Sequence, residues 1–262
     1  MPVVFAAFTS HPPLLLPTIG KGAQEKLLNT EAAMEQLEKE LYLSKPHVIL
    51  IISPHVGLFP DVFVMNAHSH FVSDFEQLGD LTTKQMWNGI PELAAKIRYK
   101  INHGKTQVRL VSTEKLDHGC TIPLFYLTKH LPNVKILPVG FSEQSPKDHV
   151  AFGETLKECL AESEKRIAVI GSGDLAHTLT DDAPAGFHEM GKEFDAKIRE
   201  YLEQGKYAEI AEFDPKFIKN AVECGYRSLL ILLGILSHSP WRFRTLCYEA
   251  PFGVGYLTGH WE

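Results

Sequence analysis

The chain has 262 residues, of which 44% are hydrophobic and 22% are charged, and its formal net charge is −6. This length and composition suit one α/β domain with a large core and argue against a disordered chain. Lys and Arg are scattered along the sequence, so no basic stripe predicts a nucleic-acid partner.

Short continuous apolar runs alternate with amphipathic segments up to about residue 204. Such runs are typical of parallel strands that are buried on both faces. In chain order we expect a strand at 3–8, a helix at 24–43, strands at 48–54 and 61–67, a helix at 82–101, a strand at 107–112, a helix beginning near Pro123, a strand at 134–141, a helix at 147–164, a strand at 166–173 and a helix at 186–204.

The pattern changes after residue 205. We expect three helices, at 206–213, 215–222 and 226–236, followed by an antiparallel pair of strands at 242–250 and 253–261. No internal repeat or linker is visible, so we predict a single domain over residues 1–262. The fold class is α/β, with a mostly parallel central sheet, helices on both faces and an antiparallel C-terminal edge.

The cysteines and the apolar segments indicate where the protein works. The four cysteines include no CxxC pair, which fits a reducing compartment rather than a disulfide framework. The amino-terminal segment lacks the basic start of a signal peptide, and the apolar run from Leu229 is too short to span a bilayer. We therefore expect a soluble cytoplasmic protein with no membrane partner.

Four histidines stand where an apolar run gives way to a polar loop: His11 in FTSHPP, His55 in LIISPH, His118 in LDHGC and His177 in IGSGDLAH. Ligands collect at the carboxyl ends of parallel strands, and imidazole is the commonest metal ligand in proteins. A single buried histidine is usually only a hydrogen-bonded core residue. Repetition at equivalent places favours a shared, metal-centred active site.

The segment GSGDLA, residues 171–176, matches the dinucleotide fingerprint G-x-G-x-x-G/A and follows an expected strand. That fingerprint needs a helix that opens at its glycines, whereas HTLTDDAPAG continues with Thr, Asp, Pro and Gly. We therefore interpret these glycines as a tight loop beside a ligand pocket and not as a nicotinamide site.

Five segments occur in one order: SHPP, SPHVG, DHG before a proline-led helix, SGDLAH and ECGYRSL. Together they resemble the class III extradiol ring-cleavage dioxygenases of the catalytic B-subunit type, and they are also similar to the Memo proteins, which share that fold. The resemblance extends from Phe8 to Gly255. It implies an Fe(II) ion held by His11, His55 and Glu223, a triad that leaves positions open for other ligands. The resemblance also implies zinc as a substitute metal in a purified or crystallised form.

The identity of the third ligand stays open. Glu249 and Asp174 are alternative carboxylates, and Glu223 can instead be a charge at the end of a helix. Memo proteins carry Cys near this place, and Cys224 directly follows Glu223. A thiolate ligand would favour a different metal or a redox role.

The resemblance also implies roles for the other two histidines. His177 resembles the acid/base that takes a proton from the substrate hydroxyl and returns it during ring opening, a task that suits a pKa near the working pH. His118 resembles a residue near bound dioxygen that hydrogen bonds to it as negative charge develops. The alternatives are a core histidine at 177 and a histidine that only orders its own turn at 118, with Asp117 holding that turn.

The resemblance implies an enzyme of aromatic compound catabolism that opens the ring of a catechol or aminophenol with O2. Its partners would be a small aromatic substrate and O2, and a homo-oligomer is compatible with the sequence. Two other classes would use the same residues. One is a divalent-metal hydrolase that activates water, and the other is a Memo-like metal- or peptide-binding or redox protein.

Overall fold

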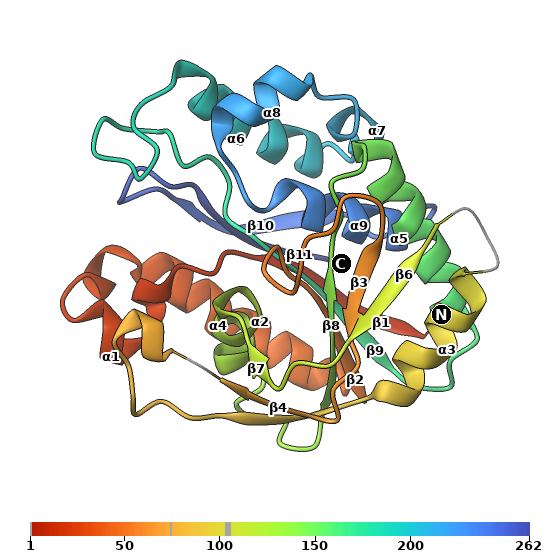
Figure 1. The fold of residues 1–262 in the computed structure, drawn as a ribbon. Coiled ribbons are helices and arrows are strands. Elements are labelled where there is room, and N and C mark those ends of the chain that lie inside the picture. Colours follow the sequence, from red (N-terminus) through yellow and green to blue (C-terminus); the bar gives the residue numbers. More distant parts are fainter. Residues whose placement is uncertain (1, 74, 103–105) are drawn as a thin grey trace.

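The structure is a computed structural model that describes residues 2–73, 75–102 and 106–262. Four neighbouring parallel strands form the centre of its sheet (Figure 1). In spatial order they are β1 (Val3–Thr9), β9 (Ile167–Ser172), β2 (Val48–Ile52) and β8 (Lys135–Gly140). Each is a continuous apolar run buried on both faces, as the sequence predicts.

Further strands extend both sides of this centre. On the side of β1 lie β11 (Tyr256–Trp261) and then β10 (Phe243–Glu249), which pair antiparallel to each other. The predicted α/β class with its antiparallel C-terminal edge is confirmed. On the side of β8 lie β5 (Met86–Gly89), β4 (His70–Ser73), β7 (Lys115–Leu116), β3 (Phe63–Asn66) and β6 (Val108–Val111).

Helices cover both faces of the sheet. In Figure 1, α6 (Glu189–Glu203), α8 (Pro215–Ala221) and α9 (Tyr226–Ile235) lie on one side of the central strands, and α2 (Leu28–Ser44) and α4 (His118–Leu127) lie on the other. The remaining helices are α1 (Pro17–Gly20), α3 (Pro91–Ile101), α5 (Pro146–Ala161) and α7 (Tyr207–Ile210). No helix in the described part of the chain combines the length and apolarity needed to cross a membrane.

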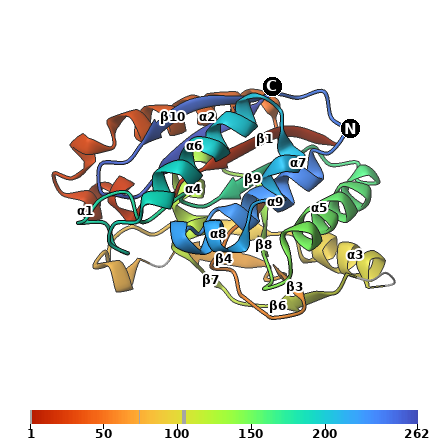
Figure 2. The ribbon, with the colours of Figure 1, turned by 90° about the horizontal axis from the view of Figure 1, so that it is seen from above.

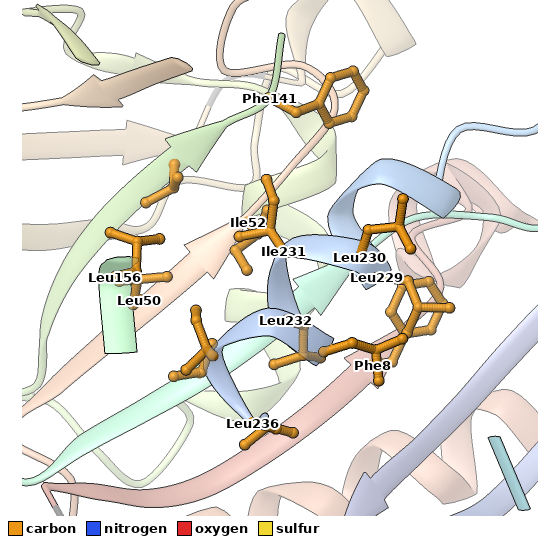
Figure 3. Packing of buried hydrophobic residues seen from close by; sticks show 14 of the residues in the cluster. Phe8, Leu50, Ile52, Phe141, Leu156, Leu229, Leu230, Ile231, Leu232 and Leu236 are labelled. Carbon is orange, nitrogen blue, oxygen red and sulfur yellow. The ribbon is translucent and has the colours of Figure 1, made fainter. Parts of the chain in front are cut away.

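Alternate residues of each central strand point into two different cores. Leu50 and Ile52 of β2 face the core of α3, α5, α6 and α9, whereas Ile49 and Ile51 face the core of α2 and α4. Figure 3 shows the first core, where α9 packs against Phe8 and β2 residues. At roughly 1.5–3 kcal/mol for each fully buried aliphatic or Phe side chain, these two layers supply most of the driving force for folding.

One predicted helix was wrong in its first half. Residues 82–90 do not continue α3 but form β5 and its flanks, and β4 was not expected. Proline at position 91 restricts the residue before it to extended conformations, and Ile90 has φ −135° and ψ 67°. The helix therefore starts at Pro91, and Trp87 of β5 packs beside Phe71 of β4 in the core of α2 and α4.

The helix expected near Pro123 begins five residues earlier, at His118. Asp117 caps it, because its carboxylate accepts a hydrogen bond of 3.0 Å from the backbone N–H of Cys120. The predicted turn role of Asp117 is thereby confirmed. Pro123 lies inside the helix, so the carbonyl of Gly119 has no helical N–H to accept.

The carboxyl ends of β1, β9 and β2 meet at one edge of the sheet because these strands are parallel neighbours. Because β11 runs antiparallel to β1, the start of β1 and the end of β11 lie at the other end of these strands, away from this edge (Figure 2). The loops after the three parallel strands are therefore the ones that can form a common site.

Candidate active site

Three of the four predicted histidines come together at this edge. His11 follows β1, His55 follows β2, and His118 is the first residue of α4. The ring centroids are 5.4 Å apart for His11 and His55, 5.3 Å for His11 and His118, and 4.2 Å for His55 and His118. One nitrogen from each ring lies within 4.8 Å of the other two, which is close enough for all three to hold one metal ion.

The histidines are held in the neutral state that metal binding requires. The pKa of His11 lies well below its ordinary value, first because the ring is buried and then because His118 and His55 would repel its charge. Burial and the nearby His55 lower the pKa of His118 to about 4. At neutral pH these rings offer lone pairs rather than positive charge, so they are suitable ligands for a divalent cation.

A chain of hydrogen bonds orients His55. The backbone N–H of His55 donates to Ser53 Oγ at 3.2 Å, and Ser53 Oγ donates to the carboxylate of Asp117 at 2.7 Å. Asp117 also caps α4, so the same carboxylate fixes the loop of His55 and the start of the helix that carries His118. The fully buried Ser53 was not predicted to matter, although it directly follows β2 in the sequence.

A second group of potential ligands shares His11. The Sγ atom of Cys224 lies 3.6 Å from His11 Nε2, and a carboxylate oxygen of Asp174 lies 4.0 Å from the same nitrogen. The other oxygen of Asp174 accepts the backbone N–H of His11 at 2.9 Å. Burial raises the pKa of Asp174 to about 7 and that of the Cys224 thiol well above its ordinary value, so a bound cation would have to release these protons.

Two glycines allow the loops that carry Asp174 and Cys224 to touch. A Cβ atom on Gly173 would lie 2.1 Å from the Cα of Gly225, which only glycine avoids. The carbonyl of Asp174 then accepts the backbone N–H groups of Cys224 at 3.2 Å and of Gly225 at 2.9 Å. These contacts join the loop after β9 to the segment before α9.

The predicted ligand Glu223 belongs to neither group of clustered atoms among the described residues. Its carboxylate accepts the backbone N–H of Tyr226 at 2.5 Å, at the start of α9. Burial raises its pKa to about 7, although this hydrogen bond and the charge of Arg227 act in the opposite direction. The side chain of Glu249, another candidate, accepts hydrogen bonds from Asn29 and Thr30 at the start of α2. Ligation by Glu223 stays a prediction.

His177 lies in the loop after β9, and its imidazole is partly buried. Its pKa is lowered, mainly by burial and further by His55. The Nε2 atom is buried and has no hydrogen-bond partner within the described ranges. A buried nitrogen without a partner is costly unless a ligand or water completes it, so this atom is available to a bound molecule.

A cavity of about 440 Å³ opens beside His55 and His118. This volume is in the usual range for small-molecule sites. The cavity is also lined by Val56, Asn66, Leu78, Thr113, Lys115, Leu116 and Asp117. The histidine cluster therefore has space beside it for a molecule of the size of a substituted benzene.

Asp195 on α6 supports the loop of His177 from behind. Its side chain is 1% exposed, and it accepts the backbone N–H of Ala176 at 2.8 Å and the hydroxyl of Tyr248 at 2.7 Å. Sequence reasoning missed it, although a carboxylate in the apolar stripe of Phe194, Ile198 and Leu202 is the pattern that could have revealed it.

Substitution of Asp195 should change how stability depends on pH. Burial raises its pKa to about 7, whereas an unfolded chain releases this proton near the ordinary value of about 3.9. The free energy of unfolding of the wild type therefore falls as the pH rises from about 4 to about 7. The decrease is a few kcal/mol, at about 1.4 kcal/mol per pKa unit. Urea unfolding at pH 5 and 8 should show Asp195→Asn gaining stability relative to wild type at the higher pH. The exposed Asp61→Asn is the control, and a pH-independent difference for Asp195→Asn would contradict the expectation.

The comparisons with known proteins agree with the site. The family model described as the catalytic LigB subunit of aromatic ring-opening dioxygenase matches residues 5–259. Protein CA_C1420 of Clostridium acetobutylicum is 29% identical over 256 residues, which are 94% of this chain and 54% of that protein, so the chain spans about half the length of this relative. The crystal structure of the uncharacterized protein JW3007 from Escherichia coli K12 has the same fold, with a TM-score of 0.67 at 16% identity and coverage of 98% of this chain and 99% of that chain.

Several relatives carry names of enzymes. The 4,5-DOPA dioxygenase extradiol of Mirabilis jalapa is 25% identical over 196 residues, covering 72% of this chain and 71% of the relative. A 2,3-dihydroxyphenylpropionate/2,3-dihydroxicinnamic acid 1,2-dioxygenase of Xanthobacter autotrophicus is 26% identical over 197 residues, covering 69% and 60%. The resemblance seen in the sequence is thereby confirmed at the level of the family, and the chain belongs to the LigB family of catalytic subunits of aromatic ring-opening dioxygenases.

Proposed function

We propose that this chain is a non-haem Fe(II) enzyme that opens the ring of a catechol or aminophenol with O2. The observation that carries the proposal is the convergence of three imidazoles, two of which, His55 and His118, line a cavity of about 440 Å³. The names of the dioxygenase relatives support the reaction type. The proposal includes a small aromatic substrate and a place in cytoplasmic aromatic catabolism.

The side chains fit a divalent metal. We propose His11 and His55 as ligands and Glu223 as the third, with Cys224 as the alternative because its Sγ lies 3.6 Å from His11 Nε2. Bound Fe(II) would supply open coordination positions for both the substrate and O2. Neutral imidazoles with one anionic ligand keep the net charge of such a centre low.

The remaining histidines would handle protons. His177, whose lowered pKa keeps it neutral at pH 7, would accept the proton of the substrate hydroxyl at Nε2, which has no partner among the described residues, and later return it. His118 lines the cavity and is neutral down to about pH 4, so its N–H can donate a hydrogen bond to an oxygen that gains negative charge. Leu116, also at the cavity wall, adds apolar surface for an aromatic ring.

The test is metal analysis after anaerobic purification, followed by O2 uptake with catechols and 2-aminophenols. We expect O2 uptake that requires added Fe(II), consumes one O2 per substrate and gives a coloured ring-opened product. The exposed His70→Ala variant is the control and should keep full activity, because His70 lies on β4 outside the histidine cluster. Fe(II)-loaded protein that consumes no O2 with any of these compounds would contradict the proposal.

One observation favours a second candidate, a Memo-like metal-binding or redox protein. Cys224 Sγ accepts the backbone N–H of Asp174 at 3.1 Å, which favours a thiolate against the larger effect of burial, and a bound cation would complete the loss of the proton. If this candidate is correct, Cys224→Ser should abolish metal retention while Glu223→Gln keeps it, and O2 uptake with catechols should be absent. The dioxygenase with a Glu223 ligand requires the opposite order of the two variants.

A further inference from the structure

The hydroxyl of Ser172 joins a proposed metal ligand to the helix that carries another histidine. Ser172 is the last residue of β9 and is fully buried. Its Oγ lies 2.8 Å from His11 Nδ1 and 2.6 Å from the carbonyl oxygen of Gly119 in the first turn of α4. Ser172 therefore lies behind His11, on the side away from Cys224.

The proline in α4 leaves the carbonyl of Gly119 able to accept the Ser172 proton. In a regular helix the carbonyl of Gly119 would accept the N–H of the residue four positions later. That residue is Pro123, which has no N–H. A carbonyl oxygen can only accept, so the 2.6 Å contact requires the single hydroxyl proton of Ser172 to point at Gly119.

The consequence falls on His11. With its proton committed to Gly119, the Ser172 oxygen can only accept from His11, so Nδ1 must carry the ring hydrogen. We infer that Ser172 is a positioning residue that fixes the Nδ1–H tautomer of His11 and thereby directs the Nε2 lone pair at a bound metal ion. The inference rests on the proposed function insofar as it takes His11 as a metal ligand. A group that fixes the tautomer of a ligating histidine typically contributes 10- to 100-fold to metal affinity.

The tautomer can be measured on the metal-free wild-type protein. Long-range ¹H–¹⁵N correlation spectra of ¹⁵N-histidine-labelled protein distinguish protonated from unprotonated ring nitrogens, and loss of one spin system in His11→Gln assigns the signal. We expect His11 to show a protonated Nδ1 and an unprotonated Nε2. A protonated Nε2 in the wild type would overturn the inference without any variant having to fold.

Metal affinity provides the second readout. Ser172→Ala should bind Fe(II) about 10- to 100-fold more weakly, measured anaerobically by competition with a chelator, and its His11 should populate the Nε2–H tautomer. Ser228→Ala is the matched control, since Ser228 is equally buried and its hydroxyl has no hydrogen-bond partner in the described segments. A folded Ser172→Ala with wild-type tautomer and affinity would overturn the inference. Absence of catechol turnover in the wild type, with the Nδ1–H tautomer present, would count against the proposed function alone.

Discussion

We expect the His177→Gln variant to keep its Fe(II) and its affinity for catechol while the chemical step slows by about 10²- to 10⁴-fold, the usual contribution of a positioned proton transfer. A metal ligand holds the ion in every state, whereas an acid/base acts mainly where a proton moves in the transition state. The position of His177 agrees with the second role, because its Nε2 is unpartnered and it is absent from the clustered ligand atoms of the described residues.

Three measurements on one preparation separate the possibilities for His177. They are iron content, anaerobic substrate affinity and single-turnover ring opening. Loss of iron would make His177 a ligand, and unchanged turnover would return it to a structural role in its loop. The exposed His70→Gln variant controls for the loss of an imidazole elsewhere.

The His11→Ala variant should lose its metal, with iron content falling from near one per chain to near zero, while the protein stays folded. His11 follows the end of β1, and its ring lies against His55 and His118 and contacts the hydroxyl of Ser172. Metal analysis and circular dichroism on the same sample measure the two expectations.

The matched control for His11 is His149→Ala. His149 is also fully buried, but its ring nitrogens lie 2.8 Å from the carbonyl of Ser145 and 3.2 Å from that of Ser142, at the start of α5. We expect this control to lose stability and to keep its metal. Full iron stoichiometry in His11→Ala would show that His11 is structural and that the ligand set is wrong.

The sequence predicted the parts of the fold that repeat a simple pattern. The apolar runs of β1, β2, β8 and β9 are continuous because both faces are buried, and this pattern has few alternatives. The prediction failed for residues 82–90 because their apolar spacing is compatible with a helix. Only the pairing of β5 with β4 and β8 makes part of this segment a strand. Pairing partners far away in the chain are not visible in local periodicity.

The site shows the same division. The sequence singled out His11, His55 and His118, and the structure brings them together, because strand ends in a parallel sheet share one edge. The hydroxyls of Ser53 and Ser172 could not be recognised, since their importance depends on which proton points at which acceptor. Glu223 and Cys224 are adjacent in the sequence, and Asp174 lies in another loop. The choice among them depends on where their side chains point, which sequence spacing does not predict.

The sheet separates two cores that, among the described residues, have no side chain in common, yet the site takes residues from both layers. His118 begins α4, which packs in one core, and Cys224 precedes α9, which packs in the other. The distance between these two side chains therefore measures how the helical layers sit relative to each other. Repacking of either core, far from any histidine, would change the distance between the residues that the two layers contribute to the site. Tolerance to core substitutions in this protein is therefore limited by the alignment of the two layers as well as by stability.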